Sequence, residues 1–187
     1  MNNFSVGILG GSALGTNQLF CHAAINLAKE LSKLDCEIIC CGGATGLIGE
    51  FITHHNNTQN IHAYILNQEL KSTSSLIKNV NFCTNTSHRK SQILEKSDLI
   101  IALPGGLGTF DELFSFIAAQ KIGEHTKPII LLNIAKFYNP LISIFENLVT
   151  AGFLKKQHLA RVNPITSVDG VAEITLDILK STIENKK

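Results

Sequence analysis

The sequence predicts an α/β fold, a doubly wound parallel sheet with helices on both faces, formed by a single domain over residues 1–187. Three observations lead to this prediction. Short apolar runs alternate with longer runs of helical period. The runs Leu99–Leu103 and Ile129–Leu132 are continuously apolar, as expected of parallel strands that are covered on both faces. Glycine-rich turns join several of these runs to the helical segment that follows.

The elements follow one another in strand-then-helix order. The predicted strands are Val6–Leu9, Glu37–Cys41, His62–Leu66, Leu99–Leu103, Pro128–Leu132 and Asn163–Ser167, with Val80–Cys83 as a weaker candidate. The predicted helices are Leu19–Leu34, Leu47–His54, Ser87–Lys96, Phe110–Ile122, Pro140–Ala151 and Val171–Ile183. No linker or repeat interrupts this order. Sheets of this kind bind ligands at the carboxyl ends of their strands.

The composition indicates which class of ligand the protein binds. Apolar residues form 44% of the chain and charged residues 17%, a globular balance that leaves apolar surface for an oligomer interface. The net charge of +1 provides no long-range positive field, and no run of Lys or Arg exceeds two residues. We therefore expect a small-molecule ligand and no nucleic acid.

The cysteines and the apolar runs indicate the compartment. The five cysteines are odd in number and form no C-x-x-C pair, which suits a reducing compartment. The apolar runs are far shorter than the roughly 20 residues that cross a bilayer, and the first residues carry no basic segment. We expect a cytoplasmic protein without a membrane partner.

Two glycine turns follow the first two predicted strands. Gly10–Thr16 departs from G-x-G-x-x-G at Ser12 and has no Lys after Gly15, which disfavours dinucleotide binding and ATP hydrolysis. Gly42–Gly49 opens the next helix, so two sets of backbone N–H donors are expected side by side. Either turn can also be a tight strand-to-helix connection without a ligand.

The third glycine turn carries the most side-chain chemistry. In Leu103–Glu112, three glycines can present N–H groups to a phosphate, Thr109 adds a hydroxyl, and the helix start adds its positive pole. Glu112 follows one turn later. The spacing Thr109-x-x-Glu112 also fits a capping box, in which the two side chains bind free N–H groups at the helix start. Both roles remain open for Glu112.

These motifs resemble the Lonely Guy phosphoribohydrolase family, whose members were once described as lysine decarboxylases. The resemblance rests on the P-G-G-x-G-T-x-x-E motif ending at Glu112 and on Arg89-Lys90 before it. It extends over Gly10–Ser12, Gly42–Gly49, Ser97–Leu103, Lys127-Pro128, Leu131–Asn133, Tyr138-Asn139 and Gly152-Phe153. It implies a Rossmann-like domain that hydrolyses a nucleoside 5′-monophosphate to a purine or cytokinin-type base and ribose 5-phosphate.

The resemblance also assigns residues and partners. It implies catalytic roles for Arg89 and Glu112, no metal or organic cofactor, and a homodimer or larger even assembly that pairs through helices beside the active site. The substrate-binding residues that it implies are Gly11, Ser12, Gly42, Gly43, Lys90, Gly105, Gly106, Leu107, Gly108 and Thr109. A carboxylate suits this chemistry, because N-glycoside cleavage passes through an oxocarbenium-like transition state. Asp111 would point about 100° away from Glu112 on a helix.

Four positions depart from the family pattern, and one of them, Cys41, replaces a glycine that is common before Gly42-Gly43. Thr86 replaces a common Met, and Ala118-Ala119 replaces a Thr-Trp pair, which predicts a more permissive base pocket. Two other functions fit the sequence less well. A carrier of a phosphorylated ligand, like the molybdenum-cofactor carriers, would use a similar glycine loop but has no need of a catalytic carboxylate. A decarboxylase would need a pyridoxal-phosphate lysine context, which the sequence does not show.

Overall fold

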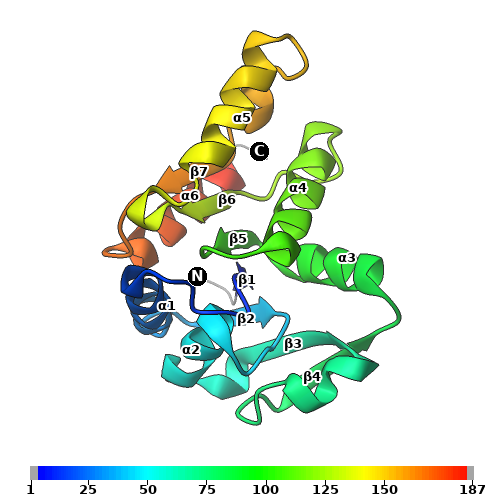
Figure 1. The fold of residues 1–187 in the computed structure, drawn as a ribbon, viewed down its shortest axis with the longest axis vertical. Coiled ribbons are helices and arrows are strands. Elements are labelled where there is room, and N and C mark those ends of the chain that lie inside the picture. The colour runs from blue at the N-terminus through cyan, green and yellow to red at the C-terminus, as the bar shows by residue number, and fades with distance from the viewer. Residues whose placement is uncertain (1–3, 185–187) are drawn as a thin grey trace.

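A seven-stranded parallel sheet forms the centre of the computed structural model, which describes residues 4–184 (Figure 1). The strands lie in the order β4-β3-β2-β1-β5-β6-β7, and every neighbouring pair is parallel. They span Phe4–Leu9 (β1), Cys36–Cys40 (β2), Ile61–Leu66 (β3), Asn79–Cys83 (β4), Leu99–Ala102 (β5), Ile129–Leu132 (β6) and Val162–Ile165 (β7). The predicted doubly wound α/β fold is confirmed.

Helices cover both faces of the sheet. They span Gln18–Leu31 (α1), Gly46–His54 (α2), Thr86–Lys96 (α3), Leu107–Lys121 (α4), Asn139–Thr150 (α5) and Val171–Glu184 (α6), with 3-10 turns at Thr58–Asn60 (η1), Asn67–Ser72 (η2), Ile134–Lys136 (η3) and Lys156–Leu159 (η4). Buried residues of α1, α2 and α6 share one apolar cluster, and those of α3, α4 and α5 share another. The two clusters lie on opposite faces of the sheet.

The continuously apolar strands supply both clusters. In β5, Leu99 and Ile101 pack into the cluster of α1, α2 and α6, whereas Ile100 and Ala102 pack into the other. Side chains that follow one another in a strand point to opposite faces, so a strand in a sheet with two covered faces needs apolar residues at every position. This requirement explains why β5 and β6 show no alternation of apolar and polar residues.

In the strand order, β1 and β5 flank the point at which the order of the strands reverses. From β1 the chain moves outward through β2 and β3 to β4, and then crosses back so that β5 pairs with the free side of β1. The segments after β1 and β5 lead to α1 and α4, which cover opposite faces. A crevice therefore forms at the carboxyl ends of these two strands.

Helix α4 begins three residues before the predicted Phe110. Gly106 is its N-cap, and the N–H of Phe110 already donates to the carbonyl of Gly106. Glycine without a side chain tolerates the extended N-cap conformation well. Thr109 is consequently the third residue of the helix rather than its cap, and the capping-box interpretation of Thr109 and Glu112 is wrong.

One buried tyrosine fixes the end of β5. The Tyr138 hydroxyl donates to the carbonyl of Leu103 at 2.7 Å, and the Tyr138 N–H donates to Oδ1 of Asn133 at 2.7 Å. Tyr138 is fully buried. Leu103 stands directly before the Pro104-Gly105-Gly106 turn, so this bond anchors that turn to the segment between β6 and α5.

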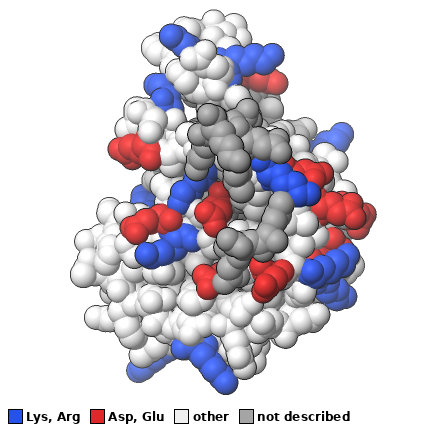
Figure 2. Space-filling view, turned by 180° about the vertical axis from the view of Figure 1, so that it is seen from behind, with Lys and Arg blue, Asp and Glu red and all other residues white. Residues whose placement is uncertain are grey.

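The charged side chains seen in Figure 2 are mixed in sign. Lys and Arg alternate with Asp and Glu across this face, and no continuous basic surface is visible on it. Over residues 4–184, none of the helices combines the length and the apolar character that a bilayer span requires.

Candidate functional site

A cavity of about 370 Å³ lies at the carboxyl ends of β1, β2 and β5. This volume falls in the range of about 300 to 1,000 Å³ that is usual for ligand pockets. Of the residues selected from the sequence, those that line the cavity are Gly11, Ser12, Gly43, Arg89, Gly106, Leu107, Gly108, Thr109 and Glu112. The crevice predicted from the strand order is therefore the place where the sequence motifs meet.

The start of α4 forms one wall of the cavity. The first N–H groups of a helix have no acceptor within the helix, and here they belong to Leu107, Gly108 and Thr109. Aligned peptide dipoles add a partial positive charge at this end. The wall can therefore bind a phosphate through backbone donors.

Several glycines of the motifs serve the packing of the loops. The N–H of Gly11 donates to the carbonyl of Pro104 at 3.0 Å, which ties the turn after β1 to the turn after β5. Gly42 has a φ of +70° and lies against Ala63. A side chain at Gly105 would collide with Thr109. Gly42 and Gly105 do not line the cavity, so the structure gives them the role of bringing backbones close together.

Lys90 also lies outside the cavity lining. Its Nζ donates to both carboxylate oxygens of Asp111, at 2.8 and 2.9 Å, and to Oγ of Ser115 at 3.0 Å. These bonds join α3 to α4 on the outer side of the site. They tie down the helix that carries the neighbouring Arg89, and they hold the Asp111 carboxylate outside the lining of the cavity to which Glu112 belongs.

Glu112 is a buried carboxylate that faces the cavity. Only 7% of the residue is exposed, and no hydrogen bond to its carboxylate forms within residues 4–184. Burial raises the pKa of Glu112 to about 7, although the positive charge of Arg89 acts in the opposite direction. The side chain therefore changes its charge near neutral pH, as a group that takes part in acid-base or electrostatic catalysis does.

Arg89 lies in the first turns of α3, where the side chain of Asn85 caps the helix by accepting the N–H of His88. Its side chain is 17% exposed. NH1 donates to the two carboxylate oxygens of Glu69 at 2.7 and 2.9 Å, whereas the buried Nε has no partner in the part of the chain that is described. Arg89 also lines the cavity, so its guanidinium can contact a ligand there.

Glu69 is a site residue that the sequence motifs do not predict. It belongs to η2, a 3-10 turn after β3, and it lines the cavity beside Arg89. No hydrophobic period or motif marks this segment. Its position just beyond the carboxyl end of a parallel strand was the signal that could have singled it out.

The residues that suggested a permissive base pocket do not line this cavity. Thr86 and Ala118 are exposed, and Ala119 lies near the end of α4. The cavity instead contains Cys41, which occupies the position of a common family glycine. Burial raises the pKa of the Cys41 thiol to about 11, so it stays protonated near neutral pH.

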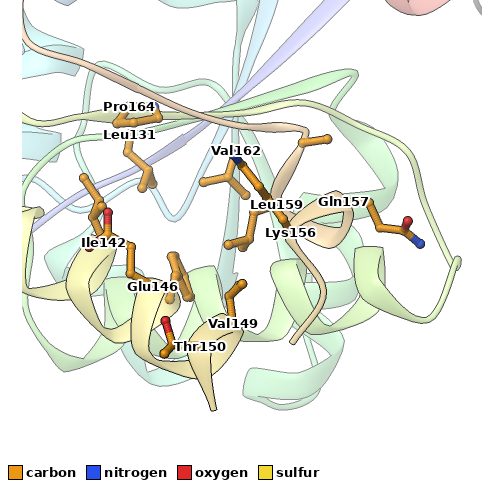
Figure 3. Close-up of a pocket in the computed structure, with 12 residues that line it drawn as sticks. Leu131, Ile142, Glu146, Val149, Thr150, Lys156, Gln157, Leu159, Val162 and Pro164 are labelled. Carbon is orange, nitrogen blue, oxygen red and sulfur yellow. The ribbon is translucent and has the colours of Figure 1, made fainter. Parts of the chain in front are cut away.

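A second hollow of about 760 Å³ lies between α5, η4 and β7 (Figure 3). Its lining is mostly apolar and includes Leu131, Phe145 and Val162, with Glu146 and Lys156 as its charged residues. It contains none of the glycine turns. Within residues 4–184, no group of three His, Cys, Asp or Glu side chains is placed to hold a metal ion.

Structural comparison reveals the same fold in known proteins. A molybdenum cofactor carrier protein from Chlamydomonas reinhardtii superposes with a TM-score of 0.71 at 16% identity, over 96% of this chain and 99% of the other. A single-stranded-DNA-binding DNA processing protein A from Helicobacter pylori superposes with a TM-score of 0.58, also at 16% identity, over 93% and 80% of the two chains. At such identities the likeness concerns the fold alone.

Sequence comparison identifies the family. A family model described as "Possible lysine decarboxylase" matches residues 35–175. A probable cytokinin riboside 5′-monophosphate phosphoribohydrolase of Oryza sativa is 34% identical over 155 residues, which cover 80% of this chain but 63% of the relative. A cytokinin riboside 5′-monophosphate phosphoribohydrolase of Arabidopsis thaliana is 32% identical over 149 residues, 77% of this chain and 68% of the relative. The chain belongs to the Lonely Guy family, the group that the lysine decarboxylase description covers.

Proposed function

We propose that this protein hydrolyses the N-glycosidic bond of a nucleoside 5′-monophosphate and releases a purine or cytokinin-type base. The observation that carries the proposal is the juxtaposition, in one cavity, of the buried Glu112 carboxylate, the Arg89 guanidinium and the free N–H groups at the start of α4. The relatives from Oryza sativa and Arabidopsis thaliana are named for this activity.

Each part of the cavity has a separate role in the proposed reaction. The N–H groups of Leu107, Gly108 and Thr109 bind the 5′-phosphate. The bond between ribose C1′ and the base nitrogen breaks and its electron pair passes to the base. Water adds its hydroxyl to C1′, and the remaining proton of that water goes to the base. Glu112 stabilises the positive charge that develops on the ribose, and Arg89 binds an oxygen of the phosphate or of the leaving base. The products are a free base and ribose 5-phosphate.

A panel of nucleoside monophosphates tests the proposal. The purified protein is incubated with adenine, guanine and prenylated-adenine nucleotides, and the released base is measured by chromatography. We expect release from at least one of them. Tight binding of a nucleotide without turnover would instead favour a carrier of a phosphorylated ligand.

The 5′-phosphate is expected to be essential. Adenosine should react with a kcat/KM at least about a hundredfold below that of its monophosphate, because the nucleoside leaves the N–H groups at the start of α4 without an anion. Steady-state kinetics on the two compounds measure the ratio. Equal values would show that these donors bind something other than the phosphate.

We also propose a homodimer that pairs through the helices beside the site. Exposed large apolar residues lie on α4, on α5 and at their ends: Phe114, Ile122, Ile144 and Phe153. The rings of Phe114 and Phe145 lie in edge contact, so α4 and α5 adjoin there (Figure 1). Burial of such a surface favours association.

Light scattering at micromolar concentration is expected to give twice the 20.3 kDa chain mass, and a stable monomer would exclude this interface.

The proposal also covers the class of ligand and the cellular location. We propose a small-molecule ligand rather than a nucleic acid, supported by the net charge of +1 and by the mixed charges in Figure 2. We propose a cytoplasmic location, supported by the five cysteines, all of which have free thiols.

A further inference from the structure

Glu69 is fixed on two sides within the cavity. Its Oε2 accepts the N–H of Leu66 at 2.8 Å, which holds the carboxylate over the end of β3. The same carboxylate receives NH1 of Arg89 at 2.7 and 2.9 Å. One contact belongs to the chain just before η2 and the other to α3, so Glu69 links the end of β3 to the proposed catalytic arginine.

Arg89 therefore stands between two carboxylates. It is hydrogen-bonded to Glu69, and the charge of Glu112 also acts on it, although no hydrogen bond joins Arg89 to Glu112. A guanidinium binds one carboxylate strongly when it forms paired or shared hydrogen bonds with it. Glu69 and Glu112 consequently compete for a single cation, and the structure shows Glu69 holding it.

We propose that Glu69 is a positioning residue that holds the Arg89 guanidinium away from Glu112 and thereby leaves the Glu112 carboxylate without a bonded cation. The effect of this positioning on catalysis rests on the proposed function. A carboxylate already bonded to arginine gives less additional stabilisation to a cationic transition state, because that bond weakens its field and must be lost or shared. Arg89 remains in the cavity lining while it is paired with Glu69, so a ligand can also contact its guanidinium there.

Several charged or titratable groups act on or near Glu112. Arg89 and Lys90 come from α3, Asp111 from α4, Glu69 from η2, and Cys40 and Cys41 from the end of β2. Replacing Glu69 by glutamine removes one negative charge and weakens the bond that holds Arg89. Both changes lower the pKa of Glu112, because a negative neighbour is lost and a positive one is free to approach.

A carboxyl titration tests this without any substrate. Glutamate is labelled with ¹³C at its side-chain carboxyl, the Glu112 signal is identified by its loss in Glu112→Gln, and its midpoint is followed by NMR. In Glu69→Gln we expect the midpoint to fall by at least about one pH unit. Glu95→Gln is the matched control, since it also removes one negative charge but lies at the far end of α3, exposed and outside the cavity. Its Glu112 midpoint should equal that of the wild type.

An unchanged Glu112 midpoint in a folded Glu69→Gln protein overturns the proposal and leaves Glu69 as a tether of η2 alone. Glutamine retains a carbonyl oxygen for the Leu66 N–H, so the fold should persist. Should Glu69→Gln fail to fold, Glu69→Asp serves instead, because the shorter side chain withdraws the carboxylate from Arg89. The midpoint should again fall, by a smaller amount, and no change would count equally against the proposal.

Kinetics separate this inference from the proposed function. In Glu69→Gln, the kcat for a nucleoside monophosphate should fall by about tenfold or more while KM stays within about threefold, because the phosphate donors are intact. The pH at which kcat is half its maximum should move with the Glu112 midpoint. If the wild type releases no base, the proposed function fails, and the titration still decides whether Glu69 positions Arg89.

Discussion

Glu112→Gln is expected to lower the turnover of a nucleoside 5′-monophosphate by about a hundredfold or more, while the nucleotide still binds. The substitution removes the negative charge that stabilises the cationic transition state, whereas the N–H groups of α4 and the Arg89 guanidinium remain. Single-turnover kinetics measure the first effect and calorimetry the second.

In the wild type, turnover should fall as pH drops below about 7, because protonation of Glu112 neutralises the same charge.

The stability of the wild type relative to Glu112→Gln is expected to depend on pH in a defined direction. Burial raises the pKa of Glu112 from an ordinary value of 4.5 to about 7 in the folded protein. The folded state therefore binds this proton more tightly than the unfolded state, and the associated stability is present below about pH 4.5 and is lost as pH rises through about 7. At pH 8 the buried charge costs on the order of 3 kcal/mol.

Glutamine carries no such charge. Glu112→Gln should consequently be more stable than the wild type at pH 8 by that order, and equally stable near pH 4, as measured by urea unfolding at the two pH values. Asp111→Asn is the matched control for activity, because Asp111 is adjacent in sequence but bonds Lys90 outside the cavity. It should retain turnover. A glutamine variant that is less stable at pH 8 and hydrolyses normally would make Glu112 a structural residue.

The fold could be predicted because each strand carries its own signal. Residues 99–102 and 129–132 are apolar at every position, and this pattern requires a helix layer on each face of the sheet. The helix starts were harder to predict. The expected start at Phe110 followed the apolar period, whereas the glycine N-cap at Gly106 admits a turn of helix that has no period of its own.

The site could be predicted only in part, because a motif does not distinguish contact from support. Gly11 and Gly106 belong to similar turns, yet the N–H of Gly11 donates to the carbonyl of Pro104, whereas the turn of Gly106 begins a helix with free donors. Lys90 follows Arg89 directly and still points to Asp111. Glu69 lies in a turn without a pattern, and its role depends on a contact across 20 positions of the chain. Such roles depend on tertiary packing.

The backbone of the second glycine turn should be the most sensitive part of the site to a small substitution. Gly46 begins α2 with a φ of +69°, a left-handed conformation that side chains disfavour. A Cβ at this position would overlap the backbone of Ser12 and Ala13 in the first turn. Backbone cannot rotate away as a side chain can, so the two turns would have to separate.

Gly46→Ala is therefore expected to destabilise the protein by about 3 kcal/mol or more, from the strained φ together with the overlap. For a chain of this length, the midpoint of thermal unfolding should fall by roughly 6–12 °C. The separation would also strain two bonds that join the turns, from the N–H of Leu47 to the carbonyl of Gly11 at 2.9 Å and from the Thr45 hydroxyl to the carbonyl of Ser12 at 3.2 Å.

Gly43→Ala is the matched control for stability. Gly43 stands three residues earlier in the same turn, its φ lies outside the left-handed range, and a Cβ there meets no atom within 4 Å. Its thermal midpoint should stay within about 2 °C of the wild type, since an alanine at an unstrained and open position costs little. Equal midpoints for Gly46→Ala and Gly43→Ala would mean that the first two turns separate at little cost. The cavity between them would then be adjustable rather than held in shape by close backbone contact at Gly46.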